Sequence, residues 1–168
     1  MAGQTGKGPP FFGKYRGKVT KNRDDKSLGR VRATVPDIYG ENESGWALPA
    51  LPYAGSGVGL FLIPPEGASV WIEFEKGDPD YPIWSGCFWA EGEAPVSPAV
   101  PEKKVLRTPG ATITIDDSVP AGVITIETEA GMEIKLDAKG IKINNGSGAS
   151  IKLTGPKVSI NEGALEVT

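Results

Sequence analysis

The chain contains no histidine among its 168 residues. That absence excludes histidine-based catalytic triads, imidazole metal ligands and the commonest general base of enzymes. A carboxylate pair, Glu73 and Glu75, remains formally possible, but the alternating pattern around it predicts two ordinary exposed residues on one side of a strand. We therefore predict that the chain is not an enzyme and has no catalytic residue, no metal site and no cofactor.

Cysteine and long apolar runs are also scarce. Cys87 is the only cysteine, so intrachain disulfides are excluded, and we expect its side chain to be packed. The longest uninterrupted apolar run is Leu60–Ile63, far too short to cross a bilayer. The first ten residues lack the apolar core of a signal peptide. These features predict a soluble chain that is made in the cytoplasm without a signal peptide.

Helical periodicity is missing as well, since no window sustains a 3.6-residue repeat of apolar positions. The 23 Gly and 15 Pro favour an all-β chain with many turns. The net charge of −3 gives no general attraction to nucleic acid or anionic membranes. From Lys7 to Arg32, however, there are nine basic residues and only two acidic ones. This excess indicates the solvated face of a small β-domain or, alternatively, a contact with an acidic partner or nucleic acid.

Composition divides the chain into four regions. Residues 1–13 are predicted to form a flexible arm, residues 14–89 a small barrel, residues 90–110 a Pro-rich connector and residues 111–168 an extended β-structure. An OB-fold is the leading candidate for the barrel, and an SH3-like barrel would show nearly the same pattern. The six strands that we expect in it are Tyr15–Thr20, Arg30–Val35, Trp46–Leu51, Gly59–Ile63, Val70–Glu75 and Ile83–Phe88.

The last third of the chain is an internal repeat. Seven segments each place two aliphatic residues two positions apart, with polar residues between and after them, and glycines recur in the links. A period of two puts both aliphatics on one face of a strand. The segments are Thr112–Asp116, Val123–Glu127, Glu133–Asp137, Gly140–Asn144, Ser150–Thr154, Lys157–Asn161 and Ala164–Thr168.

A single ribbon of this kind cannot bury its apolar face, and it also leaves open hydrogen-bonding edges. Identical ribbons wound around a common axis bury that face, and three chains enclose a core narrow enough for aliphatic pairs to fill. We therefore predict an intertwined homotrimer, a triple-stranded β-helix. Its predicted trimer core consists of Ile113, Ile115, Ile124, Ile126, Ile134, Leu136, Ile141, Ile143, Ile151, Leu153, Val158, Ile160, Leu165 and Val167.

A series of motifs in fixed order resembles a known family. These motifs are Tyr15-Arg-Gly-Lys-Val19, Gly29-Arg-Val-Arg32, Pro52-Tyr-Ala-Gly55, Pro64-Pro-Glu-Gly67, Val70-Trp-Ile-Glu-Phe74, Gly77-Asp-Pro-Asp-Tyr-Pro82 and Arg107-Thr-Pro-Gly110. Together they resemble the OB-fold domain and β-helix start of contractile-tail spike proteins, including phage baseplate protein V, VgrG proteins of type VI secretion and spikes of extracellular contractile injection systems.

The resemblance implies the structural central spike of a baseplate. In such a spike a homotrimeric needle connects a tube-side hub to a PAAR-type tip protein and pierces the target envelope, with transient membrane contact. No hub segment precedes the barrel and no lysozyme domain follows it, so we expect a separate hub protein and no cell-wall cleavage. The chain also lacks a His-rich tip, which favours a separate cap. The expected tip contacts are Asn161, Glu162, Gly163, Ala164, Leu165, Glu166, Val167 and Thr168.

An alternative function is a glycan- or nucleic-acid-binding OB module on a trimeric stalk. Aromatic residues would then form a stacking platform, and Lys14, Arg16, Lys18 and Arg30 would bind a phosphate backbone. The candidate platform comprises Trp46, Trp71, Trp84, Trp89, Phe61, Phe74 and Tyr81. Core and interface packing is the simpler interpretation of these rings, and no nucleic-acid partner is expected. The particle can be a phage tail, an intracellular injection machine or a released one.

Overall fold

The computed structural model describes residues 9–167. These residues divide into two compact units, with the boundary along the chain between Gly92 and Glu93. Nearly all the regular secondary structure of both units is β-strand, so the predicted all-β fold class is confirmed. Within the described range, no helix has the length and apolar character needed to span a membrane.

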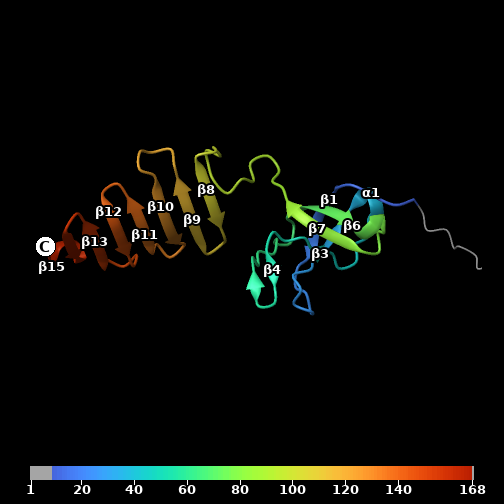
Figure 1. Cartoon of the computed structure of the whole chain (residues 1–168), viewed down its shortest axis with the longest axis horizontal. Coiled ribbons are helices and arrows are strands. Elements are labelled where there is room, and N and C mark those ends of the chain that lie inside the picture. The colour runs from blue at the N-terminus through green and yellow to red at the C-terminus, as the bar shows by residue number, and fades with distance from the viewer. Residues whose placement is uncertain (1–8, 168) are drawn as a thin grey trace, which may run out of the picture. The chain divides into compact units, whose positions relative to one another are not determined.

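The first unit is a curled five-stranded sheet (Figure 1). Its strands are ordered β2-β1-β6-β7-β3. Bridges from Val31 to Ala47 and from Thr34 to Glu43 connect the chain segments at its two edges, so the sheet closes on itself as a small barrel does. The bounds are β1 Tyr15–Lys21, β2 Arg32–Thr34, β3 Leu48–Pro49, β6 Ser69–Phe74 and β7 Pro82–Cys87.

Strand alternation builds the core of this barrel. On β6, Val70, Ile72 and Phe74 point inward and are buried, while Trp71 and Glu73 lie on the outer side. A Cβ at position 17 would lie 2.9 Å from the carbonyl oxygen of Thr34, so only glycine allows β1 and β2 to approach this closely. The remaining buried apolar residues are Val19, Val31, Ala33, Val35, Ala47 and Trp84.

Three expectations for this unit were wrong, and one short helix was not predicted. The apolar run Leu60–Ile63 is not a strand: the hairpin of β4 (Ala54–Gly55) and β5 (Val58–Gly59) ends before it, and Pro64 and Pro65, which have no N–H to donate, follow it. Residues Pro36–Tyr39 form the short helix α1, with proline at its first position. Glu75 opens the 3₁₀ turn η1 (Glu75–Gly77) instead of extending β6. Cys87 is exposed.

The N-terminal arm was predicted to be flexible over residues 1–13, and residues 1–8 lie outside the described range. Phe11 packs against the barrel instead. Its ring lies edge-on to Tyr15 and Phe74, with centroids 6.4 and 6.3 Å apart, and its N–H donates to the carbonyl of Gly77 at 2.8 Å. An apolar side chain thus attaches the end of this segment to the barrel core.

The second unit is one antiparallel meander in which every strand pairs with the next along the chain (Figure 1). It has eight strands, one more than expected, because β8 forms within the predicted connector and pairs with β9. In order, the strands are β8 Lys103–Arg107, β9 Ala111–Asp116, β10 Val123–Thr128, β11 Glu133–Asp137, β12 Gly140–Asn144, β13 Ser150–Thr154, β14 Lys157–Ile160 and β15 Leu165–Val167. A 3₁₀ turn, η2 (Asn161–Gly163), precedes β15.

A carboxylate organises the loop between β1 and β2. Asp24 accepts hydrogen bonds from the backbone N–H groups of Lys26 and Leu28, at 3.0 and 2.8 Å, and from the guanidinium group of Arg30. Its side chain is 3% exposed, and Arg30 also lies over the ring of Trp46. The Arg30 hydrogen bond, aided by the backbone donors, holds the pKa of Asp24 well below its ordinary range.

We predict that Asp24→Asn lowers the unfolding temperature of the barrel at neutral pH by several degrees. Because the pKa is depressed in the folded state, the stabilisation is complete above the ordinary carboxyl pKa of about 3.9 and is lost as pH falls toward the folded value. The difference from wild type should therefore shrink below about pH 4. Tryptophan fluorescence isolates this unit, since all four tryptophans lie between residues 46 and 89.

The matched control is Asp25→Asn. The Asp25 side chain is 80% exposed and also contacts Arg30, so its loss should change the melting temperature little. Equal losses from both variants, or a deficit of Asp24→Asn that persists unchanged into acid, would contradict the assignment.

Candidate assembly surface

Two columns of side chains run across all eight strands of the meander on one face, and every member except Lys104 is aliphatic. Directly opposed pairs define them: Ile143, for example, lies opposite both Ile134 and Ile151. The first column is Leu106, Ile113, Ile126, Ile134, Ile143, Ile151, Ile160 and Leu165. The second is Lys104, Ile115, Ile124, Leu136, Ile141, Leu153, Val158 and Val167. All fourteen residues of the predicted trimer core are therefore brought onto one surface, which we call the aliphatic face.

This aliphatic face lies open within the chain. Its members from Ile113 to Leu153 are 37–41% exposed, whereas the core side chains of the barrel are 0–7% exposed. No described side chain between residues 93 and 167 is fully buried. A continuous apolar surface of this kind marks an interaction site in a folded protein.

The two residues that begin the columns, Leu106 and Lys104, were not predicted from the sequence. Their strand reads Lys-Val-Leu-Arg and stands beside Pro109, so it lacks the aliphatic-polar-aliphatic signature of the seven later segments. Lys104 pairs with Asp117, so the second column begins with an ion pair and becomes apolar from Ile115 onward.

The opposite face is polar and carries a ladder of three lysines. Lys135, Lys142 and Lys152 stand directly opposite one another on β11, β12 and β13. Like charges in this position repel. Each is compensated by a carboxylate: Lys142 lies 3.3 Å from Glu133, and the other two lie 3.4 Å from Asp137 and 3.7 Å from Glu162. The two faces of the sheet are therefore chemically distinct.

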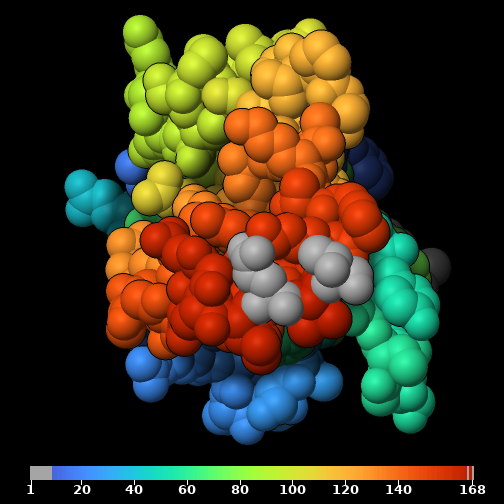
Figure 2. Space-filling model, turned by 90° about the vertical axis from the view of Figure 1, so that its left-hand side faces the viewer, coloured from blue at the N-terminus to red at the C-terminus, as the bar shows by residue number. Residues whose placement is uncertain are grey.

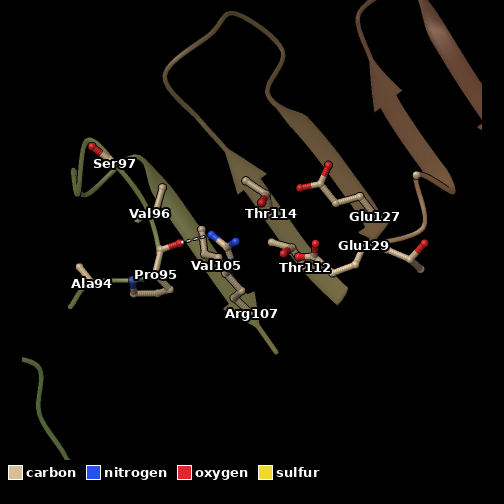
Figure 3. Close-up of a pocket in the computed structure, with 12 residues that line it drawn as sticks. Ala94, Pro95, Val96, Ser97, Val105, Arg107, Thr112, Thr114, Glu127 and Glu129 are labelled. Carbon is tan, nitrogen blue, oxygen red and sulfur yellow. Dashed lines mark hydrogen bonds between the residues drawn. The ribbon is translucent and has the colours of Figure 1, made fainter. Parts of the chain in front are cut away.

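A cavity of about 560 Å³ opens on the polar face beside β8, β9 and β10 (Figure 3). Residues 94–97 lie along one side of it, and the strands supply Arg107, Thr112 and Glu127 on the other. Arg107 donates a hydrogen bond of 3.4 Å to the carbonyl of Pro95. This contact attaches the end of the connector to the sheet.

The C-terminal strand β15 is an edge strand: within the described chain it pairs with β14 alone. Figure 2 looks onto this end, where the last strands, in red, face the viewer. Leu165 and Val167 are 55% and 60% exposed, more than the columns below them. Of the other predicted tip residues, Asn161, Glu162 and Gly163 form the exposed turn η2, which Ala164 ends. Glu166 belongs to β15, and Thr168 lies outside the described residues.

The aromatic residues of the alternative function do not share one surface. Trp84 and Phe74 are buried in the barrel core, and the indole N–H of Trp84 donates to the carbonyl of Gly29. Trp71 stacks on Phe88, with Arg16 over both rings, while Trp46 packs under Arg30 and Arg32. Trp89, Phe61 and Tyr81 are exposed. Of the four basic residues, Lys14 is paired with Glu73 and Arg30 with Asp24.

Both units match known protein families. Residues 15–89 match the type VI secretion system/phage-baseplate injector OB domain, and residues 103–166 match the phage baseplate V C-terminal trimerisation domain. These matches define a structural spike protein that combines an OB barrel with a trimerising sheet. The chain belongs to the family of phage baseplate V and VgrG-like spike proteins.

Similar curated proteins include three VgrG proteins, each 40% identical to this chain over the matched residues. Type VI secretion system spike protein VgrG3 of Vibrio cholerae El Tor matches over 88 residues, 49% of this chain and 9% of its own. VgrG4b of Pseudomonas aeruginosa matches over 65 residues, 36% and 8%, and the actin cross-linking toxin VgrG1 of V. cholerae Classical Ogawa over 86 residues, 48% and 8%. The chain spans only a small fraction of the length of these relatives.

The family assignment confirms the OB-fold and supports a homotrimer. A prediction follows for the aliphatic face. Ile143→Asp should shift the protein from trimer to monomer, because burial around a common axis would place three unpaired carboxylates in an apolar core. Light scattering measures the mass, and tryptophan fluorescence verifies that the barrel remains folded.

Lys142→Asp provides the control one residue away. This position lies on the polar face, between Lys135 and Lys152, so the same substitution should leave the trimer intact. Trimers of Ile143→Asp as stable as wild type would show that the aliphatic face is not the assembly surface.

Proposed function

We propose that three copies of the chain close their sheets around a common axis into a needle, the central spike of a contractile injection particle. The observation that carries this proposal is the open aliphatic face with its two unbroken columns. Three sheets with aliphatic pairs on their inner faces fill a narrow core without leaving a channel. The trimerisation domain matched by residues 103–166 supports the same stoichiometry.

The proposed action is mechanical. A continuous ladder of backbone hydrogen bonds connects β8 to β15, and the polar faces with their lysine ladders turn outward to water. Contraction of the particle drives this needle against the target envelope and pierces it. Resistance to unfolding under such a force is a matter of rate as much as of equilibrium stability. No catalytic residue is needed for this task.

Two partners belong to the proposal. A separate hub protein on the tube side receives the OB barrels, and a PAAR-type protein caps the needle at residues 161–168. The unpaired backbone edge of β15 and the exposed Leu165 and Val167 support a cap, because edge strands and open apolar ends associate readily. The family indicates assembly into a tail-like particle, which can be a phage tail, an intracellular machine or a released one.

The needle is tested by the mass of the native protein. Light scattering should give three times the chain mass of 17.7 kDa, independent of dilution over a wide range. A monomer mass under native conditions would refute the spike. A zymogram in which the purified protein clears peptidoglycan would refute a purely mechanical role.

The cap is tested at the top of the columns. Leu165→Asp combined with Val167→Asp should weaken binding of a PAAR-type protein by about tenfold or more, because apolar anchors dominate small interfaces. The mass should stay trimeric, because these two residues end the columns and are more exposed than the other core positions, unlike Ile143 in the middle of its column. Ser147→Asp, in the exposed turn between β12 and β13, is the control. Unchanged affinity of the double variant, measured by calorimetry, would place the cap elsewhere.

A further inference from the structure

The first unit carries an apolar surface of its own, outside the aliphatic face. Residues 52–63, comprising β4, β5 and the run that follows, form what we call the apolar hairpin. Its exposed side chains are Tyr53 at 60%, Val58 at 55%, Leu60 at 46%, Phe61 at 69% and Leu62 at 48%. No charged residue occurs from Gly45 to Pro65, although the chain as a whole is 23% charged.

This hairpin gains little stability from its own backbone pairing. Its ladder consists of two residue pairs, Ala54 with Gly59 and Gly55 with Val58. Two-stranded hairpins of any length are marginal without a packing surface. Ile63 packs against the barrel core and holds one end of the segment, so the exposed rings and aliphatics beyond it remain available to another molecule.

The absence of charge and the nearness of the other copies indicate what covers the apolar hairpin. An identical surface can meet it without like-charge repulsion. The trimerisation sheet already holds three copies together. The hydrogen bond from Arg107 to Pro95 attaches the connector to that sheet. Only residues 88–94 therefore lie between the end of β7 and this attachment point. Seven residues span at most about 25 Å, so the three barrels are held at high local concentration.

We propose that the apolar hairpins of the three copies pack against one another and form a second trimer contact within the OB units. The partner that covers each apolar hairpin is thus another copy of this chain. The inference rests on the homotrimer of the proposed function and adds to it. The contact holds the three barrels in one arrangement. A force applied to the barrels is then shared evenly among the connectors of the three chains.

Cysteine cross-linking in the full-length protein tests this contact. In a Cys87→Ser background, Phe61→Cys places one thiol on each hairpin, and a short bifunctional maleimide should convert most of the protein to covalent dimers on a denaturing gel. Val58→Cys should do the same from the other side of the hairpin. Glu41→Cys, on the exposed turn after α1, is the matched control and should remain monomeric on the gel.

The outcomes separate the two proposals. Trimer mass by light scattering with no cross-link at Phe61→Cys or Val58→Cys overturns the hairpin contact and leaves the spike intact, whereas a monomer mass overturns the spike itself. Cross-linking as strong at Glu41→Cys as at the hairpin also overturns the contact. If the protein does not cross-link at the hairpin but co-sediments with phosphatidylglycerol vesicles, the apolar hairpin binds a lipid surface. That result also overturns the proposed contact between copies.

Discussion

The structure depends on an apolar face that its own chain cannot cover. The barrel curls until its inward side chains are shielded, but strands of three to six residues joined in sequence by short connections produce a meander whose aliphatic columns remain two-fifths exposed. Folding of this sheet and association of the copies are therefore one process, and the stability of the second unit depends on protein concentration in a way that the barrel's does not.

The polar face of the meander disfavours association of the sheet through the side opposite the aliphatic face. Three lysines opposed on adjacent strands cost stability in one chain, and their carboxylate partners offset only part of it. The gain is a face that stays in water and does not stack on another sheet. The pairing register of the strands has to be exact, because it decides which side chains lie on each face. A Cβ at Gly140, whose φ is +136°, would lie 1.9 Å from the carbonyl oxygen of Leu153. A slip by one residue in β11, β12 or β13 would exchange isoleucine for lysine on the aliphatic face.

The tail was predictable because a single rule governs it. Period-two alternation identified β11, β12 and β13 to the residue, since nothing but the face of the strand determines residue type there. Where several constraints compete, the sequence was less informative. β8 was missed because Lys104 replaces an aliphatic, and Leu60–Ile63 was assigned to a strand because a short apolar run looks the same whether its barrel or another molecule covers it. The candidate site was predicted as a set of residues, but its two columns, and the charged position that begins one of them, required the register.

The length of the two columns is relevant to the mechanical role proposed for the chain. Lys104 and Asp117 mark the charged end, and Leu165 and Val167 mark the open end. Eight strands at the usual spacing of about 4.8 Å give a sheet of about 34 Å, close to the hydrocarbon thickness of one bilayer at about 30 Å. In the proposed spike, a needle of that length would not cross an envelope by its own reach. Penetration would then come from axial travel of the whole particle, and these residues would keep the cross-section narrow and intact while that force is transmitted.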